Sequence, residues 1–191
     1  MAIDWSSKLA AHLSLDASAQ SQWGGLLAEI GRGVQSAIER NISRHLEPQD
    51  HLEVYNGRGL DFIYLRWDPV ITVYSVSLYS SEQLTVGIDT DPVWPPYQAI
   101  LENEVMLSRT DGMTFPNLPG SLSVHYRAGY RVPPPALLTA GVLWGAVIFK
   151  NRDRSGISSQ SMGTQSVTFT DEPPAFVKRT LQDWTRVTGR S

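Results

Sequence analysis

The side chains with the clearest potential for chemistry are four histidines and two closely spaced glutamates. His45 and His51 lie on either side of a predicted helix end, but a metal site there would need more ligands than the neighbouring sequence offers. Glu102 and Glu104 share one face of a predicted strand, as the carboxylates of an acid–base pair do. No His, Lys or metal partner is visible near them in the sequence. We therefore interpret all of these residues as ordinary surface or half-buried side chains.

Other signatures of catalysis are missing from the sequence. Because the chain has no cysteine, it has no disulfide, Cys-ligated zinc, iron–sulfur cluster or thiol nucleophile. It also has no Gly-x-Ser-x-Gly elbow, phosphate-binding loop or dinucleotide fingerprint. The sequence therefore predicts a protein that is not an enzyme and that uses no cofactor or metal.

Composition and charge indicate a folded protein that meets other proteins. The 191 residues are 41% hydrophobic and 18% charged, which excludes an intrinsically disordered chain. Residues 1–50 carry 4 basic and 6 acidic side chains, residues 51–126 carry 3 and 9, and residues 127–191 carry 9 and 4. An acidic middle and a basic end suit contact with further copies or with an oppositely charged partner, although uneven surface charge alone is the alternative. No apolar run is long enough for a membrane span, and no signal peptide is recognised, so we expect a soluble protein made in the cytoplasm.

Both ends of the chain are predicted to be helical. Residues 1–20 form either a short helix or a mobile arm. Apolar residues from Trp23 to Leu46 recur at steps of three and four, which predicts a long helix near 23–46. Gly31 and Gly33 are unusual inside it, and a close helix neighbour is one reason to tolerate them. An apolar helix is predicted near 136–150, a flexible polar linker over 151–172, and a final helix near 174–188.

The middle of the chain, 51–127, is predicted to be an antiparallel β insertion in a helical core that spans 21–150. Residues 51–55 and 60–67 are interpreted as a hairpin around the turn at 56–59. Further strands are predicted at 70–79, 99–108 and 121–127. Residues 87–98 form a stiff loop rich in proline and aromatic residues. The predicted fold class is therefore α+β, a helical bundle with an inserted β region.

Two stretches, 52–78 and 123–151, together resemble the head–tail connector family of long-tailed DNA phages. These proteins are also called adaptor or head-completion proteins, and related ones occur in gene transfer agents. The resemblance covers 23–188 and depends on the order and spacing of three motifs. These are Glu53, Tyr55, Gly57 and Gly59 in the predicted hairpin, Asp68-Pro69-Val70 before a strand, and Ala128-Gly129-Tyr130 with Val132-Pro133 before the apolar helix.

This resemblance implies a virion protein at the head–tail interface. Family members form a ring, usually of twelve copies, beneath the portal protein. The ring extends the channel for genomic DNA, which passes without sequence-specific binding, and it offers a platform for a stopper or tail-completion protein. The family has no catalytic activity, cofactor or membrane partner.

In the family the C-terminal segment docks on the portal, which here implies 173–191. The side chains that we expect to make this contact are Phe176, Lys178, Arg179, Leu181, Trp184 and Arg186. Further partner contacts are expected from two loops, at Asn56, Gly57, Arg58, Gly59, Trp94 and Tyr97. A competing hypothesis is a β-rich module that binds carbohydrate or peptide on the aromatic loop at 92–97.

Overall fold

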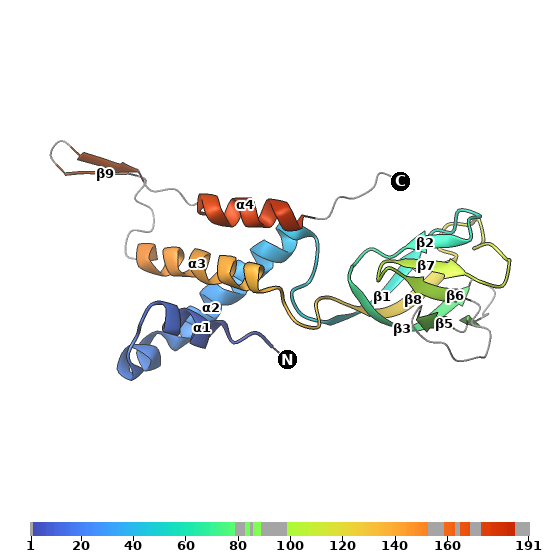
Figure 1. Ribbon diagram of the computed structural model, residues 1–191, viewed down its shortest axis with the longest axis horizontal. Coiled ribbons are helices and arrows are strands. Elements are labelled where there is room, and N and C mark those ends of the chain that lie inside the picture. Colours follow the sequence, from blue (N-terminus) through green and yellow to red (C-terminus); the bar gives the residue numbers. More distant parts are fainter. Residues whose placement is uncertain are drawn as a thin grey trace. The chain divides into compact units, whose positions relative to one another are not determined.

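The computed structural model describes residues 2–78, 83–84, 86–88, 99–152, 159–162, 165–168 and 173–185. The chain divides into two units, which are described separately below. A helical unit contains Met1–Ser43 and Pro133–Ser191, and a β unit contains Arg44–Val132 (Figure 1). The fold is therefore α+β, with the β unit inserted between the second and third helices.

The helical unit contains α1 (Trp5–His12), α2 (Ala17–Ile42), α3 (Pro135–Asn151) and α4 (Ala175–Trp184). The long helix starts six residues earlier than predicted because the Asp16 carboxylate caps it, accepting a hydrogen bond from the Ala19 backbone N–H at 2.8 Å. It also ends four residues earlier, since Ser43 adopts a left-handed conformation with φ of 55°. Pro135 occupies the first position of α3, as the sequence predicts.

The N-terminal segment forms a helix that is built into this unit. The Trp5 indole of α1 is 97% buried between α2 and α3, and its Nε1 donates to Gln35 Oε1 at 2.7 Å. A Cβ added at Gly31 would lie 2.1 Å from Trp5 Cβ, and one added at Gly141 would lie 2.5 Å from Trp5 Cη2. The expectation of a close helix neighbour is thus confirmed for Gly31. Nothing lies within 4 Å of a Cβ added at Gly33, so the same reason does not apply there.

The segment between α3 and α4, predicted as a flexible linker, contains two short strands. β9 (Ser159–Met162) and β10 (Gln165–Thr168) pair antiparallel, with Gln165 opposite Met162 and Thr168 opposite Ser159. The sequence signal for this hairpin is weak because its strands are short, polar and free of charge.

Among its described residues, the β unit contains two four-stranded sheets. The first has the order β1 (Gln49–Tyr55), β8 (Leu122–Ala128), β3 (Val70–Leu78) and β4 (Gln83–Leu84). The second has the order β2 (Phe62–Tyr64), β7 (Met106–Arg109), β6 (Ala99–Glu102) and β5 (Val86–Ile88). All of these pairs are antiparallel except β5–β6, which is parallel.

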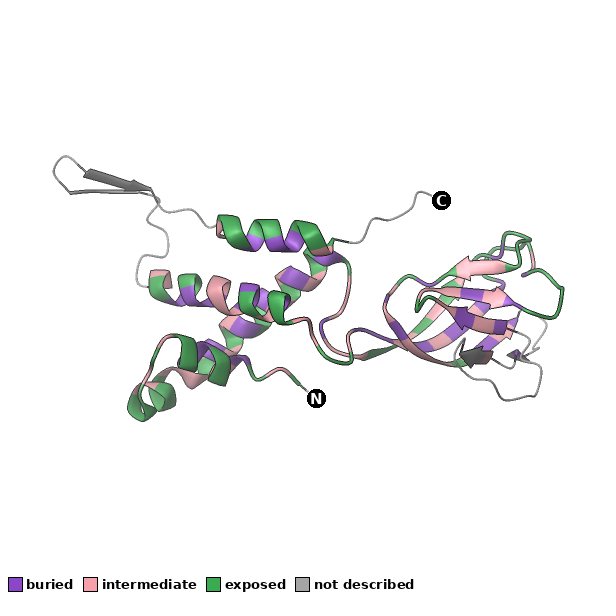
Figure 2. Cartoon of the chain, viewed as in Figure 1, coloured by how far each residue is buried: buried purple, intermediate pink, exposed green. Residues whose placement is uncertain are grey.

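One apolar core joins the two sheets (Figure 2). Leu122, Val124 and Tyr126 alternate along β8 with less buried residues, and all three are fully buried. Leu107 of β7 and Phe115 from the following loop contribute to the same core from the second sheet and its loop. The core thus depends on strands that lie far apart in the sequence.

The predicted hairpin of 51–55 with 60–67 is wrong. β1 pairs along its whole length with β8, and β2 pairs with β7. The segment 56–61 therefore passes from one sheet to the other instead of reversing between paired neighbours. A glycine-rich turn between two apolar segments is compatible with a hairpin and with a crossing between sheets, so the sequence alone does not distinguish them.

The predicted strand at 99–108 is a tight hairpin of β6 and β7. Three residues, 103–105, connect the paired Glu102 and Met106. Asn103 and Glu104 have positive φ of 50° and 57°, and the Val105 N–H donates to the Glu102 carbonyl at 3.1 Å, which closes the turn. Glu102 ends β6 while Glu104 lies in the turn, so the two carboxylates do not share one strand face. Among the helices in the described ranges, none is long and apolar enough to span a membrane.

Candidate interaction surfaces

Strand β1 is oriented with polar side chains inward and apolar ones outward. Leu52 and Val54 are 73% and 62% exposed. His51, Glu53 and Tyr55, which alternate with them, are partly buried on the other face. A strand with one solvent-exposed face normally places its apolar side chains inward. Both the buried polar side chains and the exposed apolar ones of β1 therefore need an explanation.

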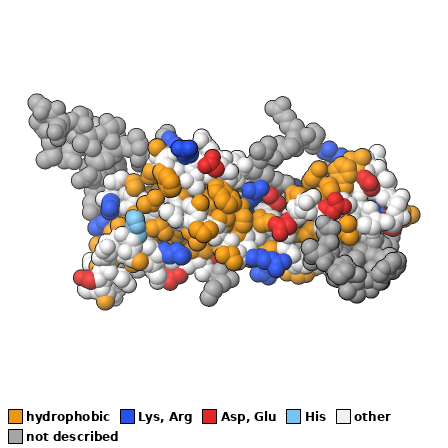
Figure 3. Space-filling model, in the orientation of Figure 1, with side chains coloured by type: hydrophobic (Ala, Val, Ile, Leu, Met, Phe, Trp, Pro, Cys, Tyr) orange, Lys and Arg blue, Asp and Glu red, His pale blue; other side chains and the backbone are white. Residues whose placement is uncertain are grey.

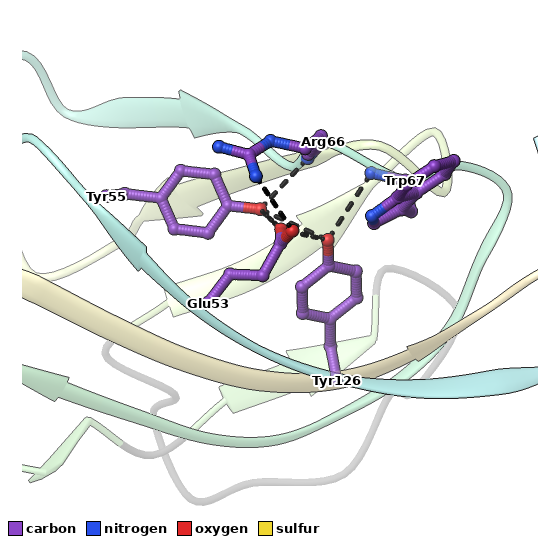
Figure 4. A network of polar contacts seen from close by, with 5 residues as sticks. All are labelled: Glu53, Tyr55, Arg66, Trp67 and Tyr126. Atoms are coloured by element: carbon purple, nitrogen blue, oxygen red, sulfur yellow. Dashed lines mark hydrogen bonds and ion pairs between the residues drawn. The ribbon is translucent and has the colours of Figure 1, made fainter. Parts of the chain in front are cut away.

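On the inner face, the Glu53 carboxylate accepts hydrogen bonds from two tyrosines (Figure 4). Tyr55 Oη donates to Glu53 Oε2 at 2.5 Å, and Tyr126 Oη donates to the same oxygen at 2.7 Å. The backbone N–H groups of Arg66 and Trp67 donate in turn to the Tyr55 and Tyr126 hydroxyls, at 2.9 and 3.3 Å. The Arg66 guanidinium approaches Glu53 Oε1 at 3.3 Å. This network ties β1 and β8 to the segment after β2.

The network shifts the pKa values of its members. Burial alone would raise the pKa of Glu53, but the hydrogen bonds from Tyr55 and Tyr126 and the charge of Arg66 outweigh it and lower that pKa. Burial and the bond to the Glu53 carboxylate raise the pKa of Tyr55 to about 12. Burial, with the hydrogen bonds to Tyr55 and Glu53, also raises the pKa of Tyr126. Glu53 is therefore held charged and both tyrosines are held neutral near pH 7.

The β unit is expected to lose stability as pH rises above 10. The pKa of Tyr55 is about 12 in the folded protein, above its ordinary value near 10. Tyr55 therefore contributes stability that is fully present below about pH 10 and is lost as the pH rises towards 12. Urea unfolding at pH 8, 10 and 11 measures this fall in the free energy of unfolding. Tyr55→Phe should flatten the slope, while Tyr64→Phe, at a 59% exposed side chain, should leave it unchanged. An equal slope in Tyr55→Phe would contradict the assignment.

His45 and His51, which the sequence does not support as metal ligands, belong to an aromatic stack. The His45 and His51 rings lie 5.1 Å apart, and Trp67 lies 4.2 Å from His45 and 5.6 Å from His51. The ring of Tyr126 is 5.4 Å from His51. In the part of the chain that the structure describes, no group of three or more His, Asp or Glu is placed to hold a metal ion. The geometry assigns these rings to packing.

The motif around Gly129 has a structural cause. Gly129 has φ of 121°, and a Cβ there would lie 2.3 Å from the Glu47 carbonyl oxygen. Its N–H donates to the Pro69 carbonyl at 2.9 Å, and the Tyr130 N–H donates to the His45 carbonyl at 3.2 Å. The end of β8 is thereby joined to both the start of β1 and the start of β3.

Helix α4 presents only part of its predicted docking face. Leu181 is buried together with Val177 and Thr180, because α4 packs against α2 and α3. Leu181 is therefore a core residue of this unit and is not available to a partner while α4 is packed. Phe176 is 55% exposed, Lys178 and Arg179 are exposed, and Trp184 is half-buried. Arg186 lies outside the described residues.

The predicted loop contacts are similarly divided. Asn56, Arg58 and Gly59 are exposed, but Gly57 is buried, so its lack of a side chain serves packing. Trp94 and Tyr97 lie outside the described residues, as does the aromatic loop of the competing carbohydrate- or peptide-binding hypothesis.

The outward face of the β1–β8–β3 sheet was not predicted from the sequence. Tyr74 is 49% exposed there, contacts the His125 ring at 4.7 Å and donates to Asp50 Oδ1 at 3.2 Å. Leu52 lies opposite His125 in the strand register, so it belongs to the same face. On the helical unit, Val147, Ile148 and Phe176 add further exposed apolar area, and Figure 3 shows hydrophobic side chains gathered over the helices. Alternation alone could not reveal which face of β1 is outward.

Comparison with known proteins finds similarity at the level of structure. The sequence matches no protein-family model and no curated protein. A chain from the neck of an empty gene transfer agent (GTA) particle, computed with C6 symmetry, is similar with a TM-score of 0.61 and 17% identity, over 97% of this chain and 90% of that one. A chain from the virion of a native GTA particle is similar with a TM-score of 0.56 and 19% identity, over 87% of this chain and 80% of that one. A chain from the neck of a native GTA particle, computed with C12 symmetry, is similar with a TM-score of 0.55 and 17% identity, over 100% of this chain and 95% of that one.

Proposed function

We propose that this chain is a head–tail adaptor, a structural virion protein that forms a ring beneath the portal and joins the capsid to the stopper or tail. The observation that carries the proposal is the similarity of nearly the whole chain, both units included, to components of gene transfer agent necks. This similarity agrees with the resemblance to connector proteins drawn from the sequence. The proposed role is assembly, without catalysis and without a cofactor.

The charge distribution supports contact between copies. The β unit carries 11 acidic and 6 basic side chains, for a net charge of −5. The helical unit carries 8 acidic and 10 basic side chains, for a net charge of +2. In a ring each subunit uses two different surfaces, one for each neighbour, and opposite charges on the two units favour such head-to-tail contacts. Acidic side chains that face the channel would repel genomic DNA and let it pass without sequence-specific binding.

Electron microscopy and mass measurement test the ring. Purified particles should show density for this protein between portal and tail, with a copy number of twelve from the ratio of its mass to that of the portal. Particles from a strain without the gene should carry full capsids and no tails. Tailed, infectious particles in that strain would overturn the proposal. A purified monomer that binds sugar or peptide and is absent from particles would favour the competing binding module.

We further propose that α4 contacts the portal through its exposed side while its other side stays packed. Val177 and Leu181 hold the helix on α2 and α3, and Phe176, Lys178 and Arg179 are exposed. A truncation at residue 173 would remove core side chains as well as the contact surface. Substitutions on the exposed side test the contact without that complication.

Phe176→Ser is expected to weaken attachment to portal-bearing capsids by about fourfold to fifteenfold. Phe176 is 55% exposed, so its complete burial at an interface would contribute about 0.8–1.6 kcal/mol, roughly half the value for a fully exposed phenylalanine. Co-sedimentation of purified adaptor with tailless capsids measures the change. Lys8→Ala, at an exposed position of α1 and outside the proposed contact surface, is the control and should attach normally. Normal attachment of Phe176→Ser, with unchanged thermal stability, would refute a docking role for this face.

A further inference from the structure

We propose that the outer edge of β1 receives the β9–β10 hairpin of a neighbouring copy, so that a continuous sheet links adjacent subunits. The inference depends on the proposed ring, because it names the surface that one copy offers to the next. It starts from an edge strand that is unlike the others in this protein.

The edge of β1 is long and unprotected. Within the ranges that the structure describes, β1 pairs only with β8, which leaves the backbone groups of its other edge without a strand partner. The other edge strands, β2, β4 and β5, have only two or three residues. β1 has seven residues with no proline and no bulge, and it exposes Leu52 and Val54. Soluble proteins usually avoid such an edge unless a partner covers it.

The hairpin supplies a matching strand. In the described part of the helical unit, β9 pairs only with β10, and a two-stranded sheet in water is marginally stable until a third strand or a packing surface is added. Its strands have four residues each, so either fits within the seven residues of β1. Neither strand carries a charged residue or a proline, so nothing in them opposes strand addition.

Charge and symmetry favour a second copy as the donor. The hairpin belongs to the unit with net charge +2, and β1 belongs to the unit with net charge −5. An edge of one unit and a hairpin of the other are different surfaces, so pairing them between copies generates a repeating head-to-tail contact. The outward Leu52 and Val54 side chains would then pack beside residues of the added strand.

Disulfide cross-linking tests the pairing, since the natural chain has no cysteine. One set of variants carries Leu52→Cys, and a second set carries a single cysteine at 159, 160, 161 or 162. The two sets are co-expressed, assembled particles are isolated, and oxidised dimers are separated on a non-reducing gel. Because the two cysteines are on different chains, only contact between copies can link them. Only directly opposite residues of paired strands lie within disulfide reach. Cross-linking is therefore expected to peak at one position of β9 or, with the matching set at 165–168, of β10, and to be weak at the adjacent positions.

Hydrogen exchange provides the second readout. The β1 amides that point to the outer edge should exchange at least tenfold more slowly in the assembled ring than in the monomer, while those already bonded to β8 should change little. Leu52→Lys should abolish the added protection and reduce assembly. Rings that form with no cross-link at any position and no added protection of β1 would overturn the inference alone. A cross-link from Leu52→Cys to the portal or another protein would also overturn it. Absence of any ring would overturn the proposed function first, and this inference with it.

Discussion

Replacing Trp5 with alanine is expected to lower the free energy of unfolding of the helical unit by about 3–5 kcal/mol, the usual loss for a large aromatic residue in a core. The indole is almost completely buried, and it fills the space that Gly31 of α2 and Gly141 of α3 leave open. Its removal creates a cavity that two rigid helices cannot easily close. It also removes the donor to Gln35 Oε1.

Urea unfolding followed by circular dichroism at 222 nm measures this loss, because the helices contribute most of that signal. Amide exchange of α1, α2 and α3 separates an effect on the helical unit from one on the β unit. The control is Lys8→Ala, at an exposed position of α1, which should change stability by less than about 0.5 kcal/mol. If Trp5→Ala behaved like the control, α1 would be an arm and not part of the bundle.

The helices were predictable from the sequence because their signals are local. The apolar period from Trp23 to Ile42 and the proline at the start of α3 identify two helices directly. The ends of α2 were placed less well, since they depend on the Asp16 cap and on the left-handed Ser43. For residues 1–20 the sequence allowed either a short helix or a mobile arm. The structure decides for the helix, because Trp5 packs in the space beside Gly31 and Gly141.

Strand pairing was not predictable in the same way. β1 and β8 are separated by more than sixty residues, and no pattern within either strand identifies the other as its partner. β1, β2, β3 and β8 were predicted near their observed positions, whereas β4, β5, β9 and β10 were not predicted. The hairpin that joined 51–55 to 60–67 was wrong. Turn residues alone do not identify the partner of a strand, because the chain after a turn can enter another sheet as well as pair with the preceding strand.

The candidate surfaces were predicted in part. The helical pattern places Phe176 on one face with Val177, Leu181 and Trp184, but the structure buries Val177 and Leu181 and leaves Phe176 exposed, because burial depends on how α4 packs. The outward face of β1 was missed because both of its faces look mixed in sequence. Glu53 lies inward only because Tyr55 and Tyr126 donate hydrogen bonds to it. That compensation involves β8 and cannot be read from β1 alone.

Gly57→Ala is expected to destabilise the β unit by about 3 kcal/mol, the upper part of the usual range for overpacking a core. A Cβ at Gly57 would lie 1.7 Å from the Pro116 carbonyl oxygen and 2.7 Å from Ser121 Oγ. The Gly57 N–H donates to Ser121 Oγ at 3.1 Å, and that hydroxyl donates to the Pro116 carbonyl at 3.1 Å. Since the obstructing oxygen belongs to the backbone, the added methyl group can be accommodated only if the two segments separate.

That separation would reach the core, because the same two segments are joined at three further points. The Gly59 N–H donates to the Phe115 carbonyl at 3.1 Å, the Phe115 N–H to the Leu60 carbonyl at 2.8 Å, and the Gly120 N–H to Asn56 Oδ1 at 2.7 Å. The matched control is Gly112→Ala, where φ is 75° but no atom lies within 4 Å, so only backbone strain of about 1–2 kcal/mol is expected. Amide hydrogen exchange of β1 and β8 measures the loss of stability of the β unit in both variants. Equal effects would mean that Gly57 is needed for a flexible turn, as its sequence suggests, and not for the contact with Pro116.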